Sequence, residues 1–178
     1  MGLNHYRFRS VWEVGAPAAE VYGVLERAGE YPAWWPQVRG AVRGDGGTGP
    51  DGWSGTVRIR SLLPYELRLA VRLTRREPAA GRLEIAMDGD LRGRAGWQVV
   101  PCPGAPGTTR VRFEQEVEAR RPLLRLLAPV CRPLLTANHA LMMRAGRRGL
   151  RRVLEERGGA RGGRPGRGST AGRGKGFG

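Results

Sequence analysis

Two adjacent polar residues, Asn138 and His139, are the side chains in this sequence best suited to chemistry. His139 is one of only two histidines in the chain, and imidazole is the side chain that titrates nearest neutral pH. It is therefore a candidate catalytic acid or base, although a base needs a second group to orient it and the sequence names none. The alternative is a half-exposed structural histidine, bonded to a loop or to the rim of a sheet.

Asn138 lies among apolar residues at helical spacing, where its amide is expected to be buried. A buried amide without a partner costs about 1–3 kcal/mol, so it must be hydrogen-bonded. Asn138 is then either an anchor for a ligand carbonyl or hydroxyl, or a structural bond to a strand backbone or to Gln115. Gln115 is a lone polar residue on the inward side of an apolar strand. It is either a ligand contact or the partner of Asn138.

Large aromatic and thioether side chains are spread along the chain at positions that face a core. Most are expected to be plain core, and a subset facing a hollow would suit a flat or greasy ligand. The ligand contacts predicted beside Asn138 and Gln115 are Met142, Trp12, Phe8, Trp97, Tyr65 and Phe113.

Several kinds of site are excluded or disfavoured. The two cysteines, Cys102 and Cys131, cannot form a disulfide framework, and close paired metal-ligand spacing is absent. Neither cysteine has an assigned histidine partner, so a nucleophilic cysteine is not expected. No phosphate loop, nucleophile elbow or dinucleotide fingerprint occurs. We therefore expect no metal and no cofactor.

The chain is strongly basic, with a formal net charge of +15 over 178 residues. Only Lys175 among the 31 basic residues is a lysine, and this arginine bias with many glycines indicates a GC-rich coding bias rather than selection for nucleic acid. Residues 158–178 form a Gly/Arg-rich segment that cannot bury apolar surface and is predicted to be disordered. Nucleic acid is not an expected partner, whereas weak contact of this tail with an anionic membrane stays open.

The alternation of apolar and polar residues predicts an antiparallel sheet in residues 1–157, which we expect to form one domain. A first strand is followed by two short helices, the second around Tyr31–Pro36, and then by about six strands. Asp88 and Asp90 share an outward side and are expected in solvent, although Asp90 is alternatively a brace for a bulge. The predicted strands are 6–14, 38–42, 53–60, 65–74, 83–88, 95–99 and 111–118.

A long amphipathic helix ends the ordered part of the sequence. Its predicted apolar stripe includes Leu134, Leu135, Asn138, Leu141, Met142, Ala145, Gly149 and Val153. The apolar face of the sheet is the only large surface available to cover this stripe. We therefore predict an α+β fold in which a curved sheet of six or seven strands wraps around the helix. Glycines at 55, 89, 93 and 96 are placed where bends would help.

Residues 6–154 resemble the START-like superfamily, also called the polyketide cyclase/dehydrase and lipid-transport group (SRPBCC), which has the helix-grip fold. Four local motifs carry the resemblance: Tyr31–Pro36 reads YPAWWP, residues 63–65 read LPY, residues 89–97 read GDLRGRAGW, and residues 138–150 read NHALMMRAGRRGL. Ala95 stands where the family pattern would have glycine. The superfamily contains cyclases, dehydratases, lipid carriers, hydrolases and binding proteins, so the resemblance implies the fold and leaves the function open.

Three functions are compatible with these residues. The first is binding of a hydrophobic small molecule, a lipid or polyketide-like compound, in an apolar cavity between the sheet and the last helix. The second is a cyclase or dehydratase in which His139 moves a proton. The third is interaction of the arginine-rich helix face and tail with an anionic surface or RNA. No apolar run spans a membrane and Met1–Arg9 does not resemble a signal peptide, so a cytoplasmic location is expected. The sequence leaves the oligomeric state open.

Overall fold

The computed structural model describes residues 5–44, 54–60, 66–120 and 128–162. Trp53 and Tyr65, the expected first residues of two strands, lie outside these ranges, as does the chain after residue 162. The side chain of Cys131 is likewise outside the described part.

Seven antiparallel strands form one sheet in the order β1-β7-β6-β5-β4-β3-β2. Along β1, Tyr6, Trp12 and Val14 are buried, whereas Arg7 and Arg9 are exposed, as the period of two predicts. The predicted α+β helix-grip architecture is confirmed. The strands are β1 (His5–Val14), β2 (Val38–Arg43), β3 (Ser54–Arg60), β4 (Glu66–Glu77), β5 (Arg82–Gly89), β6 (Leu91–Pro101) and β7 (Thr109–Ala119).

The helices within the described residues are α1 (Ala18–Glu26), the 3-10 turn η1 (Ala28–Glu30), α2 (Tyr31–Trp34) and α4 (Ala128–Gly162). Pro32 stands in the first turn of α2, where its missing N–H has no intrahelical partner to lose. The end of α4 lies beyond residue 157, the expected end of the domain, so residues 158–162 are helical rather than part of a tail. None of the described helices is long and apolar enough to cross a membrane.

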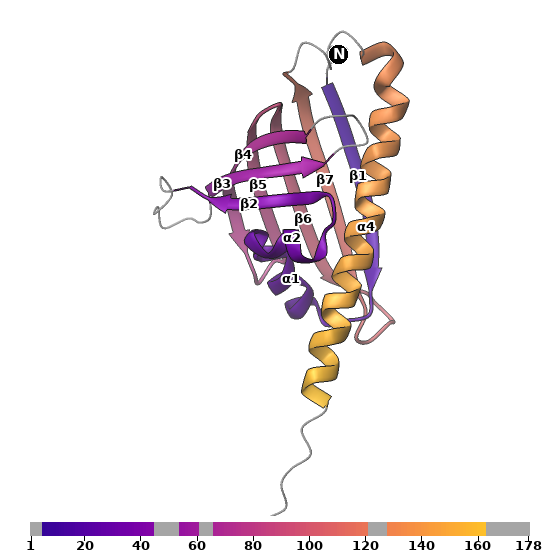
Figure 1. Cartoon of the computed structure of the whole chain (residues 1–178). Helices are drawn as coiled ribbons and strands as arrows, with labels where there is room; N and C mark the ends of the chain where they lie inside the picture. Colours follow the sequence, from indigo (N-terminus) through magenta and orange to yellow (C-terminus); the bar gives the residue numbers. More distant parts are fainter. Residues whose placement is uncertain (1–4, 45–53, 61–65, 121–127, 163–178) are drawn as a thin grey trace, which may run out of the picture.

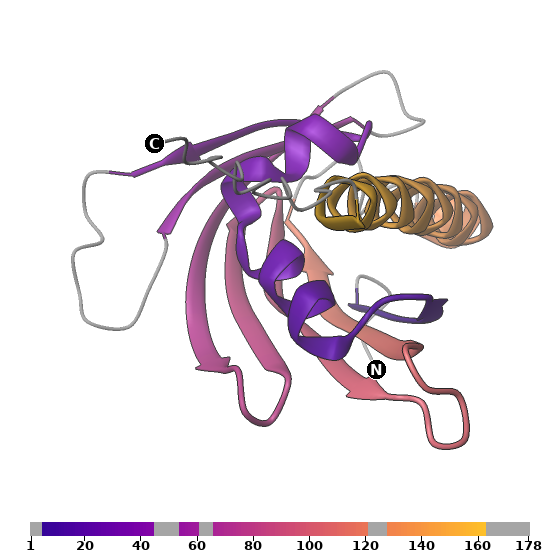
Figure 2. The same cartoon turned by 90° about the horizontal axis from the view of Figure 1, so that it is seen from below.

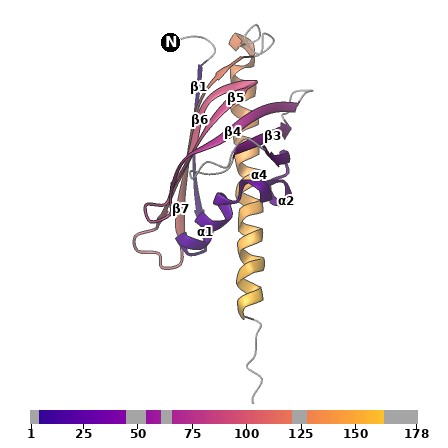
Figure 3. The ribbon, with the colours of Figure 1, turned by 90° about the vertical axis from the view of Figure 1, so that its left-hand side faces the viewer.

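The sheet curls so that its two edges approach α4 (Figures 1 and 2). Viewed from below, β1 lies on one side of α4, and α2 with β2 lies on the other (Figure 2). The helix α4 packs against β1, α1 and α2, and its last turns extend beyond the sheet (Figure 3). The helices α1, α2 and α4 therefore cover the concave side of the sheet.

Two glycines are required where β5 turns into β6 and where β6 then approaches β7 closely. Gly89 and Gly93 have φ values of +118° and +155°, and a Cβ atom at Gly93 would lie 2.0 Å from the Glu116 carbonyl oxygen. Between them, an Asp90 carboxylate oxygen accepts a hydrogen bond from the Arg68 backbone N–H at 2.8 Å. Asp90 thus braces the turn, which was the alternative to a purely solvated role.

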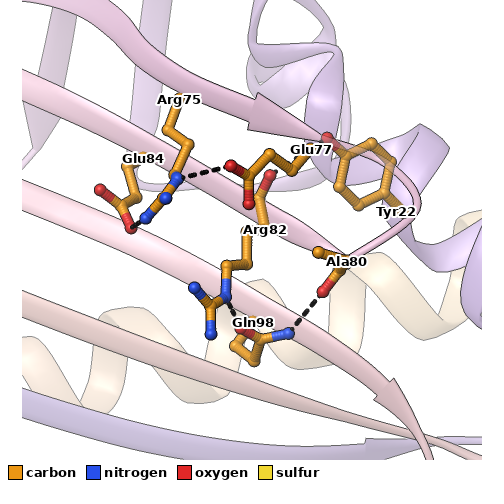
Figure 4. A network of polar contacts seen from close by, with 7 residues as sticks. All are labelled: Tyr22, Arg75, Glu77, Ala80, Arg82, Glu84 and Gln98. Atoms are coloured by element: carbon orange, nitrogen blue, oxygen red, sulfur yellow. Dashed lines mark hydrogen bonds and ion pairs between the residues drawn. The ribbon is translucent and has the colours of Figure 1, made fainter.

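The outer face of the sheet carries a network of polar contacts (Figure 4). Arg75 donates to Glu77 at 2.9 Å and to Glu84 at 3.4 Å. The Tyr22 hydroxyl donates to the Arg82 carbonyl oxygen at 3.2 Å, which ties α1 to the start of β5. Exposed ion pairs of this kind contribute little to stability, so the energetics of the fold depend mainly on the concave side.

The buried face of α4 differs from the predicted stripe. Leu141 was expected on this face and is 45% exposed, so that assignment was wrong. Glycine explains the difference, because Gly146 lies against the Trp35 ring and Gly149 against the Trp34 backbone. Ala145 of the predicted stripe is buried, and the other buried residues follow helical spacing at His139, Met143, Gly146, Leu150 and Leu154.

A hydrogen bond fixes α4 to the tryptophan pair of α2. The Trp35 indole N–H donates to the Met142 carbonyl oxygen at 3.0 Å, and Trp35 is only 4% exposed. The stacked rings of Trp34 and Trp35 lie 5.5 Å apart. The two tryptophans therefore position the central turns of α4 over the sheet.

Candidate ligand-binding cavity

A cavity of about 200 Å³ lies on the concave side of the sheet, under the helices. Apolar cavities of roughly 150 Å³ hold benzene-sized molecules, so this one has room for a larger compound. Strands β3 to β5 supply an aliphatic wall that includes Ile59, Leu67, Val71, Leu83, Ile85 and Met87. These residues are the inward set of the predicted alternation, yet sequence reasoning did not select them as site residues.

Aromatic rings form the remaining wall. Tyr6 and Phe8 come from β1, Trp97 from β6, Phe113 from β7 and Trp35 from the end of α2. Successive rings contact one another: Tyr6 and Phe8 lie 6.1 Å apart, and Trp97 and Phe113 lie 4.5 Å apart. The contacts hold these rings in fixed positions around the hollow.

His139 lies within this aromatic wall. Its ring stacks on Phe8 at a centroid distance of 4.3 Å and on Phe113 at 5.8 Å, with interplanar angles of 19° and 23°. The residue is 8% exposed, so the expectation of a half-exposed histidine was wrong. Burial lowers the pKa of His139 to about 4, which leaves the ring neutral at pH 7. Its Nε2 atom has no hydrogen-bond partner within the described residues.

Tyr6 is a second polar residue of the cavity, and the sequence analysis did not select it. Its side chain lines the cavity and is 5% exposed. Its hydroxyl is buried without a hydrogen-bond partner among the residues that the structure describes. The available signal was its position on the inward side of β1, in phase with Phe8 and Trp12.

Most of the other predicted ligand contacts line the cavity. Asn138 is half-buried rather than fully buried, because His139 occupies the inner position of the helix. Trp12 does not line the cavity; its ring packs against those of Trp35 and Trp97, at centroid distances of 6.1 Å and 5.1 Å. Tyr65 lies outside the described residues. The predicted residues that line the cavity are Asn138, Gln115, Met142, Phe8, Trp97, Phe113 and His139.

Charge is nearly absent from the part of the cavity lining that the structure describes. Glu26 is the single charged residue in that part, and its carboxylate forms an ion pair with Arg76. The Tyr31 hydroxyl donates to the Leu25 carbonyl oxygen at 2.6 Å, and burial raises the pKa of Tyr31. No three His, Cys, Asp or Glu side chains gather as a metal site would require anywhere in the described ranges. The arrangement can enclose an apolar molecule and offers it few polar contacts.

Comparison with known proteins identifies a family to which most of the chain is similar. Residues 5–155 match the family model described as polyketide cyclase / dehydrase and lipid transport. No curated protein matches the chain.

Solved structures share the fold at low sequence identity. The Zhui aromatase/cyclase from Streptomyces sp. R1128 aligns with a TM-score of 0.74 at 15% identity, over 89% of this chain and 99% of that one. A START superfamily protein from Mycobacterium smegmatis aligns with a TM-score of 0.66 at 15% identity, over 84% and 97% of the two chains. The family match covers most of the chain, and the shared architecture agrees with it. The chain therefore belongs to the polyketide cyclase/dehydrase and lipid-transport family.

Proposed function

We propose that this protein binds a hydrophobic small molecule in the cavity between the sheet and α4. The observation that carries the proposal is a hollow of about 200 Å³ whose lining is almost entirely apolar. Transfer of an apolar ligand from water into such a site gains roughly 25 cal/mol for each Å² of surface removed from water. The general test is native mass spectrometry of gently purified protein, followed by displacement of a lipophilic dye. Failure to bind any compound of a broad panel would count against the proposal.

Filling the cavity should abolish binding without unfolding the protein. Ala95 lines the cavity from β6 and is 6% exposed, so Ala95→Phe would place a ring inside the hollow. We expect at least a tenfold loss of dye affinity, measured by fluorescence titration. Ala86→Phe is the matched control, because Ala86 lines the outer groove of the sheet rather than the cavity. Equal dye affinities in the two variants would contradict a site within the grip.

Cyclase or dehydratase chemistry is the second candidate function. It is favoured by the neutral, buried ring of His139 in the cavity wall, which could accept a proton from a confined substrate. Among the described residues, the ring contacts of His139 are with Phe8 and Phe113, and no carboxylate orients the imidazole. Ligand binding is therefore the first of the two proposed functions. In an enzyme, His139→Phe would remove turnover and leave ligand affinity largely unchanged.

Contact of the tail with an anionic surface and the cytoplasmic location stay predictions. The basic side chains Arg147, Arg148, Arg151 and Arg152 are exposed on α4, next to the basic C-terminal sequence. Deletion of residues 163–178 and measurement of liposome and RNA binding across salt concentrations test this contact. Binding that is insensitive to both changes would exclude it.

A further inference from the structure

The cavity points to a particular class of ligand. We infer that the molecule bound there is uncharged and largely apolar and carries a hydroxyl or carbonyl oxygen, rather than being a carboxylate or a pure hydrocarbon. This inference rests on the proposed binding function.

The lining residues that the structure describes offer no cation to an anionic ligand. The single charged residue among them is the acidic Glu26, which already pairs with Arg76. This is unexpected in a chain with a net charge of +15, and it means that the arginines whose side chains the structure describes lie outside the lining. An ionised carboxylate without a counter-charge is strongly disfavoured in apolar surroundings. His139 cannot serve as the counter-charge at pH 7, because burial keeps its ring neutral.

Two residues of the lining also carry polar atoms in need of a partner. Tyr6 and His139 are 5% and 8% exposed, and both the Tyr6 hydroxyl and His139 Nε2 are buried and unpaired in the described part of the chain. Phe8 and Phe113 stack on the His139 ring, so its edge, which carries Nε2, is the part left for polar contact. A buried polar group without a partner is costly, and a ligand oxygen would remove that cost.

The chemistry of these two atoms selects hydroxyl and carbonyl oxygens. The Tyr6 hydroxyl can donate or accept a hydrogen bond, and Nε2 of a neutral imidazole does one or the other according to its tautomer. A ligand hydroxyl can satisfy either atom in either tautomer. A ligand carbonyl can accept from the Tyr6 hydroxyl or from a protonated Nε2. A hydrocarbon satisfies neither.

Three probes of similar shape test the inference by equilibrium dialysis at pH 7. These are 2-naphthol, 2-methylnaphthalene and 2-naphthoate, which present a hydroxyl, a methyl group and a carboxylate. We expect 2-naphthol to bind about tenfold more tightly than 2-methylnaphthalene, because a single good hydrogen bond has about that effect on affinity. We expect 2-naphthoate to bind at least tenfold more weakly than 2-naphthol.

Variants then locate the contact. Tyr6→Phe and His139→Phe each remove a polar atom and keep a ring, so at least one of them should abolish the preference for 2-naphthol and retain affinity for 2-methylnaphthalene. Neither should lower the melting temperature at pH 7, since each removes an unpaired group. Tyr22→Phe is the matched control, because Tyr22 lies outside the cavity lining and its hydroxyl contacts Arg82 (Figure 4). It should change none of the affinities.

The outcomes distinguish failure of this inference from failure of the proposed binding function. Equal binding of 2-naphthol and 2-methylnaphthalene, or a preference that survives both variants, would overturn the assignment of the oxygen contact. Binding of 2-naphthoate as tight as that of 2-naphthol would overturn the assignment of a neutral ligand. In each of these cases the cavity still binds a ligand. If none of the probes and no lipophilic dye binds, the proposed function itself fails.

Discussion

Substitution of Gly149 by alanine is expected to destabilise the protein by about 3 kcal/mol, within the range of overpacked cores. The Cβ atom of an alanine at this position would lie 1.8 Å from the carbonyl oxygen of Trp34. A backbone oxygen cannot rotate away as a side chain can, so α4 and α2 must separate. For a chain of this size the change corresponds to a fall in melting temperature of about 10 °C, measurable by circular dichroism.

Gly158→Ala is the control for this substitution. Gly158 lies on the same helix, and a Cβ atom there would meet nothing within 4 Å. Alanine in an exposed helix is favoured over glycine by about 0.5–1 kcal/mol, so this variant should be as stable as the parent protein or slightly more stable. Equal melting temperatures for Gly149→Ala and Gly158→Ala would mean that α4 does not pack on the tryptophan pair.

Acid should destabilise the protein through His139. The pKa of this group is 6.5 when it is unperturbed and about 4 in the fold, where burial disfavours the charged ring. Between these pH values the unfolded chain binds the proton and the folded chain does not, so the free energy of unfolding falls as pH decreases. The free energy of unfolding is not reduced by this group above about pH 6.5, and it falls progressively as pH decreases toward 4. We expect a loss of about 3 kcal/mol from this group.

The comparison with His139→Phe isolates this effect in urea titrations at several pH values. Phenylalanine keeps the ring between Phe8 and Phe113 and does not titrate. Acidic groups contribute at low pH in both proteins; hydrogen bonds and charge from Arg94 lower the pKa of Glu116, for example. The difference between the two proteins therefore reports on His139 alone. Parallel curves from pH 7 to pH 4 would show that the histidine is accessible to protons in the folded state.

The strands were predictable because one face of the sheet is buried and the other is exposed to solvent. Trp12 and Val14 alternate with exposed Glu13, and the same period holds across β4 and β7, where a shift of one residue would expose the core. Hydropathy therefore determined both the location of the strands and the side that each residue faces. The two short helices and the seven-stranded sheet followed from the same patterns and from the motif resemblance.

The rotation of α4 about its axis was not predictable in this way. Glycine carries almost no hydropathy signal, so the buried Gly146 did not mark its face, and Leu141 drew the stripe toward the wrong side. The sheet and the tryptophans of α2 determine the rotation, which is information held far away in the sequence. This is why the expected places of Asn138 and His139 are exchanged between the inner face and its edge.

The hollow itself also lay beyond sequence analysis. Whether Trp12, Trp97 and Phe113 fill a space or surround it depends on how far the sheet curves. In the structure Trp12 packs against Trp97 outside the lining, whereas Trp97 and Phe113 line the cavity. Alternation predicts which residues point inward and gives no measure of the volume between them.

The four neighbouring indoles give the protein a built-in optical reporter. Trp12, Trp34, Trp35 and Trp97 form a continuous set with centroid separations of 5.1–6.2 Å. At such separations excitation absorbed by one indole passes readily to the others, so the group behaves as one antenna. Trp35 and Trp97 border the cavity. A near-ultraviolet chromophore lodged there would quench the emission of the whole antenna, and occupancy can be followed without any label.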